Sequence, residues 1–276
     1  MVRQTHLQRR TIAREATISG LGVRSGKQIT VRLLPANGEA GITVTRTDLG
    51  MTWPVDLNHT MAVPNCTCIG DERGSVAFVE HLMAVLWAAG ITDMQVHVDG
   101  PEIPLLDGSA LPLWRAIEAA GTRKLGETCD VIIPVEPILI VEDDKALMVL
   151  PSDRPRFSYS LVHPHPMIGH QFADFDSATD SFAESIAPAR TFATDDELQS
   201  LKQTGLIATG GEDNCLVIYS DHYSAPLFAG NAFARHKLMD LLGDLYLLGR
   251  PLCAHVLAYR TGHADNQALA RRIAGA

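Results

Sequence analysis

The sequence lacks a hydrophobic run long enough to cross a lipid bilayer. Its longest nearly uninterrupted apolar stretch, residues 82–91, is far shorter than the roughly 20 residues that a transmembrane helix needs. The first ten residues are basic and polar, and no apolar segment follows them, which argues against a secretory signal peptide. We therefore expect a protein with no transmembrane segment and no export signal.

The sequence also lacks an excess of basic residues and an ordered set of cysteines. Its 23 Lys and Arg are outnumbered by 32 Asp and Glu, and the net charge of −9 argues against a nucleic-acid partner. The five cysteines are odd in number and scattered, which is typical of reduced thiols in the cytoplasm. Cys66 and Cys68 form a C-x-C pair without a second pair at zinc-ribbon spacing, so no structural zinc is expected there. These features predict a cytoplasmic protein and leave its oligomeric state open.

What the sequence does contain is the same order of elements twice, in a chain that is 46% hydrophobic. Alternating segments typical of strands come first in each half, and a helix, a strand and a second helix follow. Helices are expected at residues 75–89 and 111–120 in the first half, and at 233–248 and 264–273 in the second. The pattern predicts an α+β fold of two topologically related domains, each layered from a sheet and helices.

The boundary between the halves is expected in the polar stretch 121–130. It divides the chain into a first domain of residues 1–125 and a second of residues 126–276. The second domain carries an insert around residues 174–220, with a helical pattern of its own at 195–204. An insert of this size is more often functional than idle, so we expect it to serve the site.

One predicted helix carries an unusual polar stripe. His236, Asp240 and Asp244 recur every four residues, which places them on one face of a helix whose other positions are mostly apolar. Burying an imidazole and two carboxylates is unfavourable by several kcal/mol unless each has a partner. A metal ion is the simplest partner, because His and Asp are good zinc ligands. A solvated stripe, with Lys237 paired to a carboxylate, is the alternative that the spacing leaves open.

A further ligand is expected from the other half. Glu80 and His81 lie in its first predicted helix, and in metallohydrolases one residue of such a pair binds metal while the other moves protons. If the two halves face each other across a pseudo-twofold axis, His81 completes a site with His236 and Asp240. By itself such a pair is more often a capping Glu beside a surface His.

Another histidine, His263, stands where a predicted strand ends and a helix begins. A His on such a turn is accessible enough to act as an acid, although a lone His is more often structural. Asp244 lies one helical turn beyond Asp240. If Asp244 does not bind metal, it can hydrogen-bond one nitrogen of His263 and raise its pKa.

Several motifs contain these residues, and together they resemble one known family. They are Gly20-x-Gly22-x-x-x-Gly26, Val79-Glu80-His81-Leu82, Pro101-Glu102-Ile103-Pro104-x-x-Asp107-Gly108-Ser109-Ala110, Ala189-Arg190-Thr191-Phe192, His236-Lys237-x-x-Asp240-x-x-Gly243-Asp244 and Gly262-His263-Ala264. In this order, over nearly the whole chain, the sequence resembles UDP-3-O-acyl-N-acetylglucosamine deacetylase, a zinc amidase that acts early in bacterial lipid A synthesis.

The resemblance implies a role for each matching residue. The implied zinc ligands are His81, His236 and Asp240, although Fe²⁺ suits the same donors. The implied catalytic residues are Glu80 as general base, His263 as general acid or cationic partner, Asp244 as the residue that orients His263, and Thr191 as a donor to the oxyanion. The implied substrate contacts are Lys237, Phe192 and Arg260. The resemblance further implies an acylated nucleotide sugar as substrate, an active site between the domains, and an acyl-chain passage formed by the insert.

The sequence departs from the family pattern around the expected substrate contacts. Arg24 stands where the family usually has His, Phe78 where Thr is common, Asn231 in a stretch that is usually acidic, and Asp265 at a usually apolar position. Since the implied ligands and proton-moving residues are all present, hydrolysis is expected to be preserved. The substrate stays open: the alternatives are a divergent paralogue that deacylates another N-acylated amino sugar, or a non-catalytic descendant that binds a nucleotide sugar.

Overall fold

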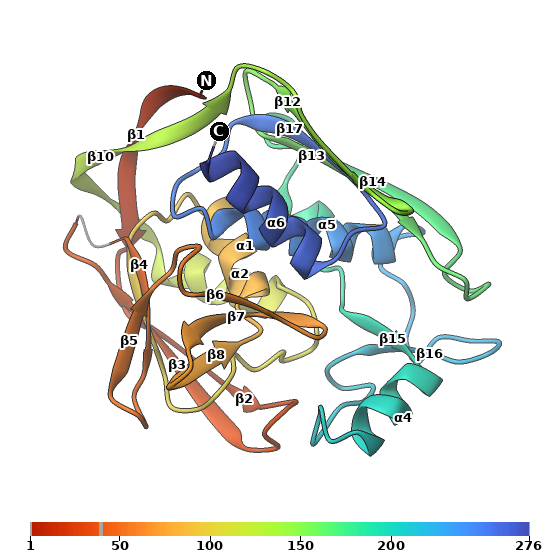
Figure 1. The fold of residues 1–276 in the computed structure, drawn as a ribbon. Coiled ribbons are helices and arrows are strands. Elements are labelled where there is room, and N and C mark those ends of the chain that lie inside the picture. Colours follow the sequence, from red (N-terminus) through yellow and green to blue (C-terminus); the bar gives the residue numbers. More distant parts are fainter. Residues whose placement is uncertain (1, 39–40, 276) are drawn as a thin grey trace.

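The chain folds into two layered halves whose sheets have the same topology (Figure 1). The computed structural model describes residues 2–38 and 41–275. The sheet of the first half has the order β2-β3-β9-β4-β5: Ala16–Leu21, Gln28–Pro35, Met94–Val98, Ile42–Arg46 and Met51–Pro54. The sheet of the second half has the order β11-β12-β17-β13-β14: Ile138–Glu142, Lys145–Pro151, Ala254–Tyr259, Arg156–Val162 and His170–Asp176.

The strand directions also correspond. The late central strand, β9 or β17, is antiparallel to one neighbour and parallel to the other in both sheets. The expectation of an α+β fold with two topologically related halves is thus confirmed. None of the helices in the described ranges is long and apolar enough to cross a bilayer.

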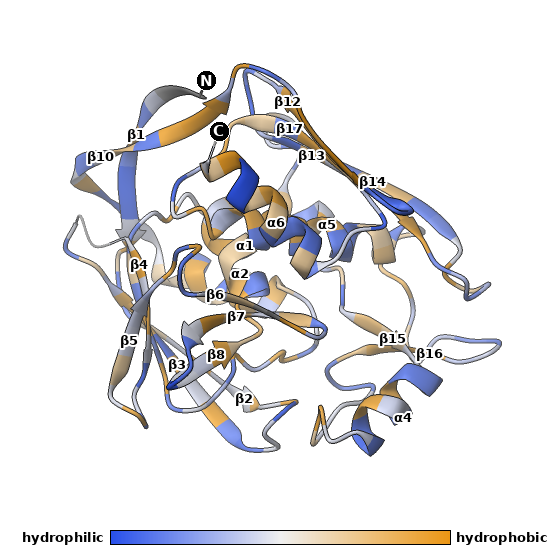
Figure 2. Cartoon of the chain, in the orientation of Figure 1, coloured by the Kyte–Doolittle hydropathy of each residue, from blue (hydrophilic) through white to orange (hydrophobic). Residues whose placement is uncertain are grey.

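Four helices fill the space between the two sheets: α1 (Glu80–Ala88), α2 (Leu111–Ala120), α5 (Ala232–Tyr246) and α6 (His263–Ala274). Along the strands, buried and outward-pointing side chains alternate, and the buried ones face the helices. In β9, Met94, Val96 and Val98 are buried toward the helices, while Gln95 and His97 point outward. Figure 2 shows the hydrophobic colouring of α1, which lies in the middle of this core. Helix α1 is buried over most of its length because it packs against α5 of the other half.

Each half carries an insert between its last sheet strand before the helices and its first long helix. The first insert is a three-stranded sheet of β6 (Thr60–Val63), β7 (Cys66–Asp71) and β8 (Gly74–Ala77). The second holds α3 (Phe182–Ser185), α4 (Asp195–Gln203) and the parallel pair β15 (Phe192–Thr194) and β16 (Leu216–Ile218). A capping box between Thr194 and Glu197 starts α4. The two inserts occupy equivalent places in the repeated topology.

Two expectations about boundaries need adjustment. The helix expected at residues 75–89 begins only at Glu80, because residues 74–77 pair with β7 as a strand. Residues 174–176 belong to β14 of the main sheet, and the second insert follows them. The stretch proposed as the domain junction lies in β10 (Thr122–Pro134), which pairs along its length with β1 (Val2–Ile12). This long ribbon ties the start of the first half to the start of the second.

The two central helices approach so closely that one position has room only for glycine. A Cβ atom on Gly243 of α5 would overlap the carbonyl oxygen of Glu80 at the start of α1. We expect Gly243→Ala to lower the free energy of unfolding by about 3 kcal/mol or more, because two backbones would have to separate. Urea unfolding of both proteins measures this change. Gly126→Ala on β10, where a Cβ meets nothing within 4 Å, is the matched control; equal midpoints for the two variants would contradict the prediction.

Candidate active site

A cavity of about 890 Å³ lies between the two halves, and the second insert forms part of its wall. One end is polar, with side chains from α1, α5 and the start of α6. The other end is apolar, lined by residues of both halves and of the insert that include Val23, Phe78, Leu198, Leu201 and Ile207. Nine of the ten residues singled out from the sequence line this cavity: Glu80, His81, Thr191, Phe192, His236, Lys237, Asp240, Arg260 and His263. Asp244 lies behind His263.

Two helices bring His81, His236 and Asp240 together. The Nε2 atoms of His81 and His236 lie 3.8 and 3.5 Å from Oδ1 of Asp240, and all three side chains are buried. Burial lowers the pKa of His81 to about 3 and also lowers that of His236, so both imidazoles are neutral. The Nδ1 atom of His236 faces the carbonyl oxygen of Ala189 at 3.2 Å, a contact that leaves Nε2 free to act as a ligand.

One oxygen of Asp240 is placed as a metal ligand would be. Oδ1 of Asp240 is buried, yet within the described part of the chain it has no hydrogen-bond partner. An unsatisfied buried carboxylate oxygen is costly, and it faces two neutral imidazole nitrogens. Two histidines and one aspartate are a donor set that zinc accepts, with a fourth position left open. These residues therefore fit a catalytic divalent ion.

The other oxygen of Asp240 is occupied by Lys237. The ammonium Nζ donates to Oδ2 at 2.7 Å. Burial favours the neutral amine, but the Asp240 carboxylate outweighs this effect and raises the pKa of Lys237. Burial likewise opposes ionisation of Asp240, while His236 and Lys237 lower its pKa below the usual range. The pair therefore stays charged at the polar end of the cavity.

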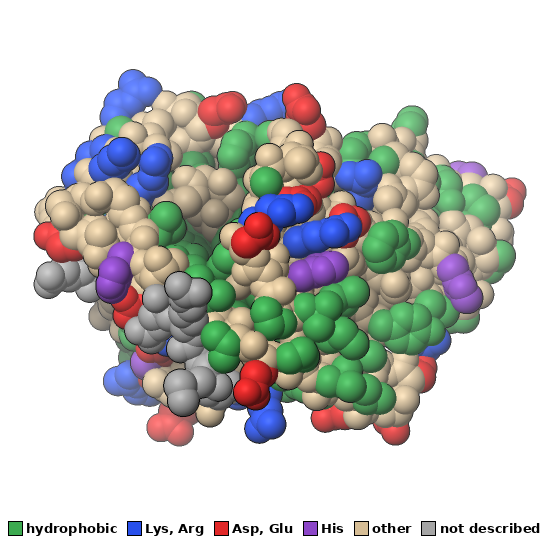
Figure 3. Space-filling model, turned by 90° about the horizontal axis from the view of Figure 1, so that it is seen from above, with side chains coloured by type: hydrophobic (Ala, Val, Ile, Leu, Met, Phe, Trp, Pro, Cys, Tyr) green, Lys and Arg blue, Asp and Glu red, His purple; other side chains and the backbone are tan. Residues whose placement is uncertain are grey.

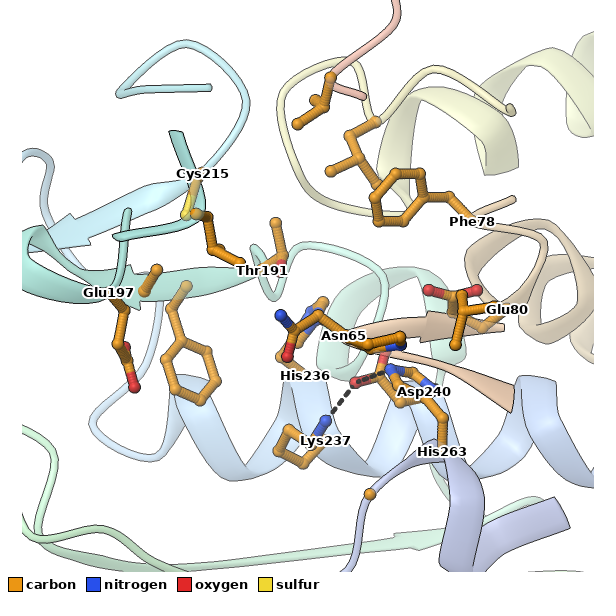
Figure 4. A pocket seen from close by; sticks show the side chains of 18 of the residues that line it. Asn65, Phe78, Glu80, Thr191, Glu197, Cys215, His236, Lys237, Asp240 and His263 are labelled. Carbon is orange, nitrogen blue, oxygen red and sulfur yellow. Dashed lines mark hydrogen bonds and ion pairs between the residues drawn. The ribbon is translucent and has the colours of Figure 1, made fainter. Parts of the chain in front are cut away.

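Glu80 reaches the cavity from the first turn of α1 (Figure 4). Its Oε2 atom accepts a hydrogen bond from the backbone N–H of Thr67 at 3.1 Å. Burial raises the pKa of Glu80 well above that of an exposed carboxyl group, while the nearby charge of His263 opposes the rise. A carboxyl group held in this way can exchange a proton with a small molecule in the cavity.

His263 is held by a buried network behind the cavity. Its Nδ1 atom lies 2.9 Å from Oδ2 of Asp244, which also accepts from Asn266 at 2.9 Å. Burial disfavours the charged imidazole, but the Asp244 carboxylate more than offsets it, and the pKa of His263 rises to about 10. His263 is therefore a cation that points its second nitrogen, Nε2, toward the side of the cavity where Asp240 lies.

Thr67 contacts both Glu80 and Asp244. It was not singled out from the sequence. Its hydroxyl donates to Oδ1 of Asp244 at 2.7 Å and accepts from Gln267 at 3.0 Å, while its N–H holds Glu80. The residue lies between Cys66 and Cys68 on β7, a strand that is buried along most of its length. The one feature of the sequence that points to Thr67 is its place inside the C-x-C pair, for which the sequence offers no metal-binding role.

If this site catalyses a reaction with a bound divalent ion, Thr67→Val should reduce kcat about tenfold with little loss of the ion. The substitution keeps the volume and the backbone contact with Glu80, but removes the donor to Asp244 and leaves Gln267 without its acceptor. Steady-state kinetics with elemental analysis of the metal measures both effects. Thr67→Ser retains the hydroxyl and should restore kcat; equal losses in the two variants would contradict the assigned hydrogen bond.

Comparison with known proteins identifies the family. A family profile described as UDP-3-O-acyl N-acetylglycosamine deacetylase matches residues 9–275. The chain belongs to this family. A UDP-3-O-acyl-N-acetylglucosamine deacetylase of Leptospira biflexa is 38% identical over 98% of this chain and 91% of its own length. Proteins with the same name from Myxococcus xanthus and Synechocystis are 35% and 38% identical, over 99% and 96% of this chain and 88% and 98% of their own lengths.

The residues of this chain that depart from the family pattern lie in different surroundings. Arg24 and Phe78 line the cavity, and Phe78 has φ of 59°, which is strained for an aromatic residue. Asp265 also lines it and holds Lys145 at 2.9 Å. Asn231 is not among the lining residues; its amide donates to the carbonyl oxygen of Phe172 and accepts from Arg235. Three of the four departures can therefore touch a bound molecule.

Phe192 and Arg260, both expected to contact substrate, already contact other side chains of the protein. Phe192 packs with its ring centroid 4.7 Å from that of Phe233 and 6.0 Å from that of His236. Arg260, which lines the cavity, pairs with Asp144 at 2.7 Å. Thr191 is fixed by backbone hydrogen bonds to Gly108 and Leu216. The second insert is thereby joined to the first half beside the polar end.

Proposed function

We propose that this chain is a zinc-dependent hydrolase that removes the N-acetyl group from UDP-3-O-acyl-N-acetylglucosamine in lipid A synthesis in the cytoplasm. The observation that carries the proposal is the unsatisfied Oδ1 of Asp240 facing His81 and His236, with Glu80 and His263 at the same end of the cavity. The names of the relatives agree with this reading. The site would lie between domains of residues 1–125 and 126–276.

The form of the cavity supports an acylated nucleotide sugar. Its polar end carries Lys237, Arg260 and Lys145. Each has a carboxylate partner, but each also has further N–H groups that can donate to phosphate oxygens. Its apolar end offers aliphatic side chains of the second insert, which suit a hydrocarbon chain. At about 890 Å³ the cavity is in the range that buries a ligand of this size.

The chemistry follows from the placement of the side chains. A zinc ion held by His81, His236 and Asp240 would supply Lewis acidity and make a water molecule available as nucleophile near neutral pH; Fe²⁺ suits the same donors. Glu80 accepts a proton from that water as it attacks the acetyl carbon. Thr191 donates a hydrogen bond to the carbonyl oxygen as negative charge develops there.

His263 acts on the other side of the breaking bond. When the C–N bond breaks, the sugar nitrogen must gain a proton, and His263 either supplies it or stabilises the charge beside it. Asp244 keeps the imidazole oriented throughout. The products are acetate and a free amino sugar.

A divergent substrate is the second candidate, and one observation favours it. Arg24 and Phe78 both line the cavity, and Arg24 donates to Sγ of Cys66 at 3.5 Å. These side chains differ in size or charge from the residues usual in the family. Another N-acylated amino sugar would then occupy the same reactive end, with the same ligands and proton-moving residues.

Two measurements on the purified protein test the proposal. Elemental analysis of unstripped protein should find about one zinc or iron per chain, and UDP-3-O-acyl-N-acetylglucosamine should yield acetate. A protein that binds metal but hydrolyses only other N-acylated sugars would establish the divergent substrate. A protein with no bound metal, and no activity after metal is added, would overturn the enzyme and leave a nucleotide-sugar-binding descendant.

A further inference from the structure

Of the Lys and Arg side chains that line the cavity, only Arg24 has no acidic partner among the described residues. The lining includes four such cations: Arg24, Lys145, Lys237 and Arg260. The last three contact carboxylates at 2.9, 2.7 and 2.7 Å, those of Asp265, Asp240 and Asp144. Several Lys and Arg side chains on the outer surface likewise lie beside Asp or Glu (Figure 3). Within residues 2–38 and 41–275, the Arg24 guanidinium makes one hydrogen bond, from Nη1 to Sγ of Cys66 at 3.5 Å.

The turn between β2 and β3 holds the backbone of Arg24 and leaves its side chain free to meet a ligand. The N–H groups of Arg24 and Ser25 donate to Oε2 and Oε1 of Glu102 at 2.9 and 2.8 Å, and Glu102 is fully buried. This carboxylate therefore binds the backbone of the turn. A guanidinium carries five N–H donors, and a thiol is a weak acceptor. Arg24 is thus a well-placed donor in the cavity, as expected of a residue that orients a ligand.

Arg24 belongs to the wall of the cavity that the first half forms. Its contact Cys66 precedes Thr67, the residue whose N–H holds Glu80. The Cys66 side chain also belongs to a buried apolar cluster of the first half and the second insert, which includes Val23, Phe78, Leu198 and Ile207. Arg24 therefore lies where the reacting end of the cavity meets the apolar end.

The three paired cations come from the second half. Lys145 lies on β12, Lys237 on α5, and Arg260 directly after β17. Figure 4 shows the reacting groups with Phe78 and Glu80 of the first half on one side and Lys237 on the other. A ligand at the reacting groups would meet Arg24 from the first half and the paired cations from the second.

The proposed substrate has acceptors that match this division. In UDP-3-O-acyl-N-acetylglucosamine the acetamide is on carbon 2 of the sugar, the diphosphate on carbon 1 and the acyl ester on carbon 3. Carbons 1 and 3 flank carbon 2, so the diphosphate and the ester leave the reacting acetamide in different directions. The three second-half cations suit the diphosphate. The ester would then lie toward the first half, at the start of the apolar end, where Arg24 stands.

An ester carbonyl that enters the cavity loses water, which is unfavourable unless a donor of the protein replaces it. On the basis of the proposed function, we propose that Arg24 is a specificity-determining residue whose guanidinium donates to the carbonyl oxygen of the 3-O-acyl ester. Arg24 stands where the family usually has His, so this donor is a departure from the family pattern. It binds the acyl group and moves no proton in the reaction.

Two sugars and UDP test the assignment: the ester substrate, an ether analogue with the same chain but no carbonyl, and UDP alone. The wild-type protein should favour the ester over the ether about tenfold in kcat/KM, the effect of one hydrogen bond to a charged group. Arg24→Met should lose this preference, mainly through KM for the ester. Its rate with the ether and its Kd for UDP should stay unchanged. Acetate release measures the rates, and calorimetry measures the Kd.

Two further variants serve as controls. Arg115→Met removes an exposed arginine of α2 outside the cavity and should leave every value unchanged. Arg24→Lys keeps a cationic donor and should retain part of the preference for the ester. An Arg24→Met protein that keeps the full preference would overturn the inference, and so would a wild type that hydrolyses ester and ether equally. A weaker Kd for UDP in Arg24→Met would reassign Arg24 to the diphosphate. If the metal-loaded wild type releases acetate from neither sugar, the proposed function fails, and this inference fails with it.

Discussion

Replacing Glu80 with Gln should reduce kcat by a factor of about 10² to 10⁴ and leave the fold and the metal content unchanged. The amide keeps the shape of the side chain and can still accept from the N–H of Thr67, but it cannot take a proton from water. Acetate release under substrate saturation measures kcat, and elemental analysis measures the metal. Glu118→Gln on the exposed side of α2 makes the same chemical change outside the cavity and should have no effect.

The split between kcat and metal content distinguishes a proton-transfer role from a structural one. If Glu80 only supported β7, Glu80→Gln would lower thermal stability and activity together. Full turnover in Glu80→Gln would contradict its assignment as general base. His263→Ala should resemble Glu80→Gln, because His263 also stands at the cavity and is not proposed as a ligand.

Replacing His81 with Ala should have a comparably large effect through a different route. The substitution removes one of three proposed ligands, and it is the only one from the first half. Metal content should fall from about one ion per chain to a small fraction, with activity falling in parallel. His222→Ala removes an exposed histidine far along the chain and should leave both unchanged.

The two ligands that remain in His81→Ala predict weakened metal binding rather than its complete loss. His236 and Asp240 stay 3.5 Å apart on one helix, so weak binding can persist, and a large excess of zinc should recover part of the lost metal. Glu80→Gln should show no such recovery of activity. A His81→Ala protein that retains a full equivalent of metal after dialysis would contradict the ligand set.

The repeated fold was predictable because each half repeats one hydrophobic pattern. The start of α1 was not predictable. Residues 75–77 form a strand because they pair with β7, and this pairing partner cannot be read from the local sequence. The pairing of β1 with β10 joins segments more than a hundred residues apart. The first part of β10, residues 122–130, is mostly polar, so no local pattern signals that it pairs with β1.

The site was predictable where helical spacing fixes geometry. His236, Asp240 and Asp244 stand four residues apart, and that spacing alone places them on one face of α5. Thr67 was not predictable, because a threonine in a buried strand shows no pattern that reveals its hydrogen-bond partners. The ion pair of Lys237 with Asp240 was foreseen only as a surface alternative, yet it lies at the polar end of the cavity.

The close contact of Gly243 with Glu80 has a consequence for how such an enzyme can diverge. At Gly243 the two helices meet backbone against backbone, and this contact holds Glu80 and His81 close to the residues of α5. Arg24 and Phe78 stand outside that contact, on loops and strand ends around the cavity. Mutations can accumulate there and select a new substrate while the reacting groups stay in register. Substrate specificity can therefore change in this fold without a change in the residues that cleave the bond.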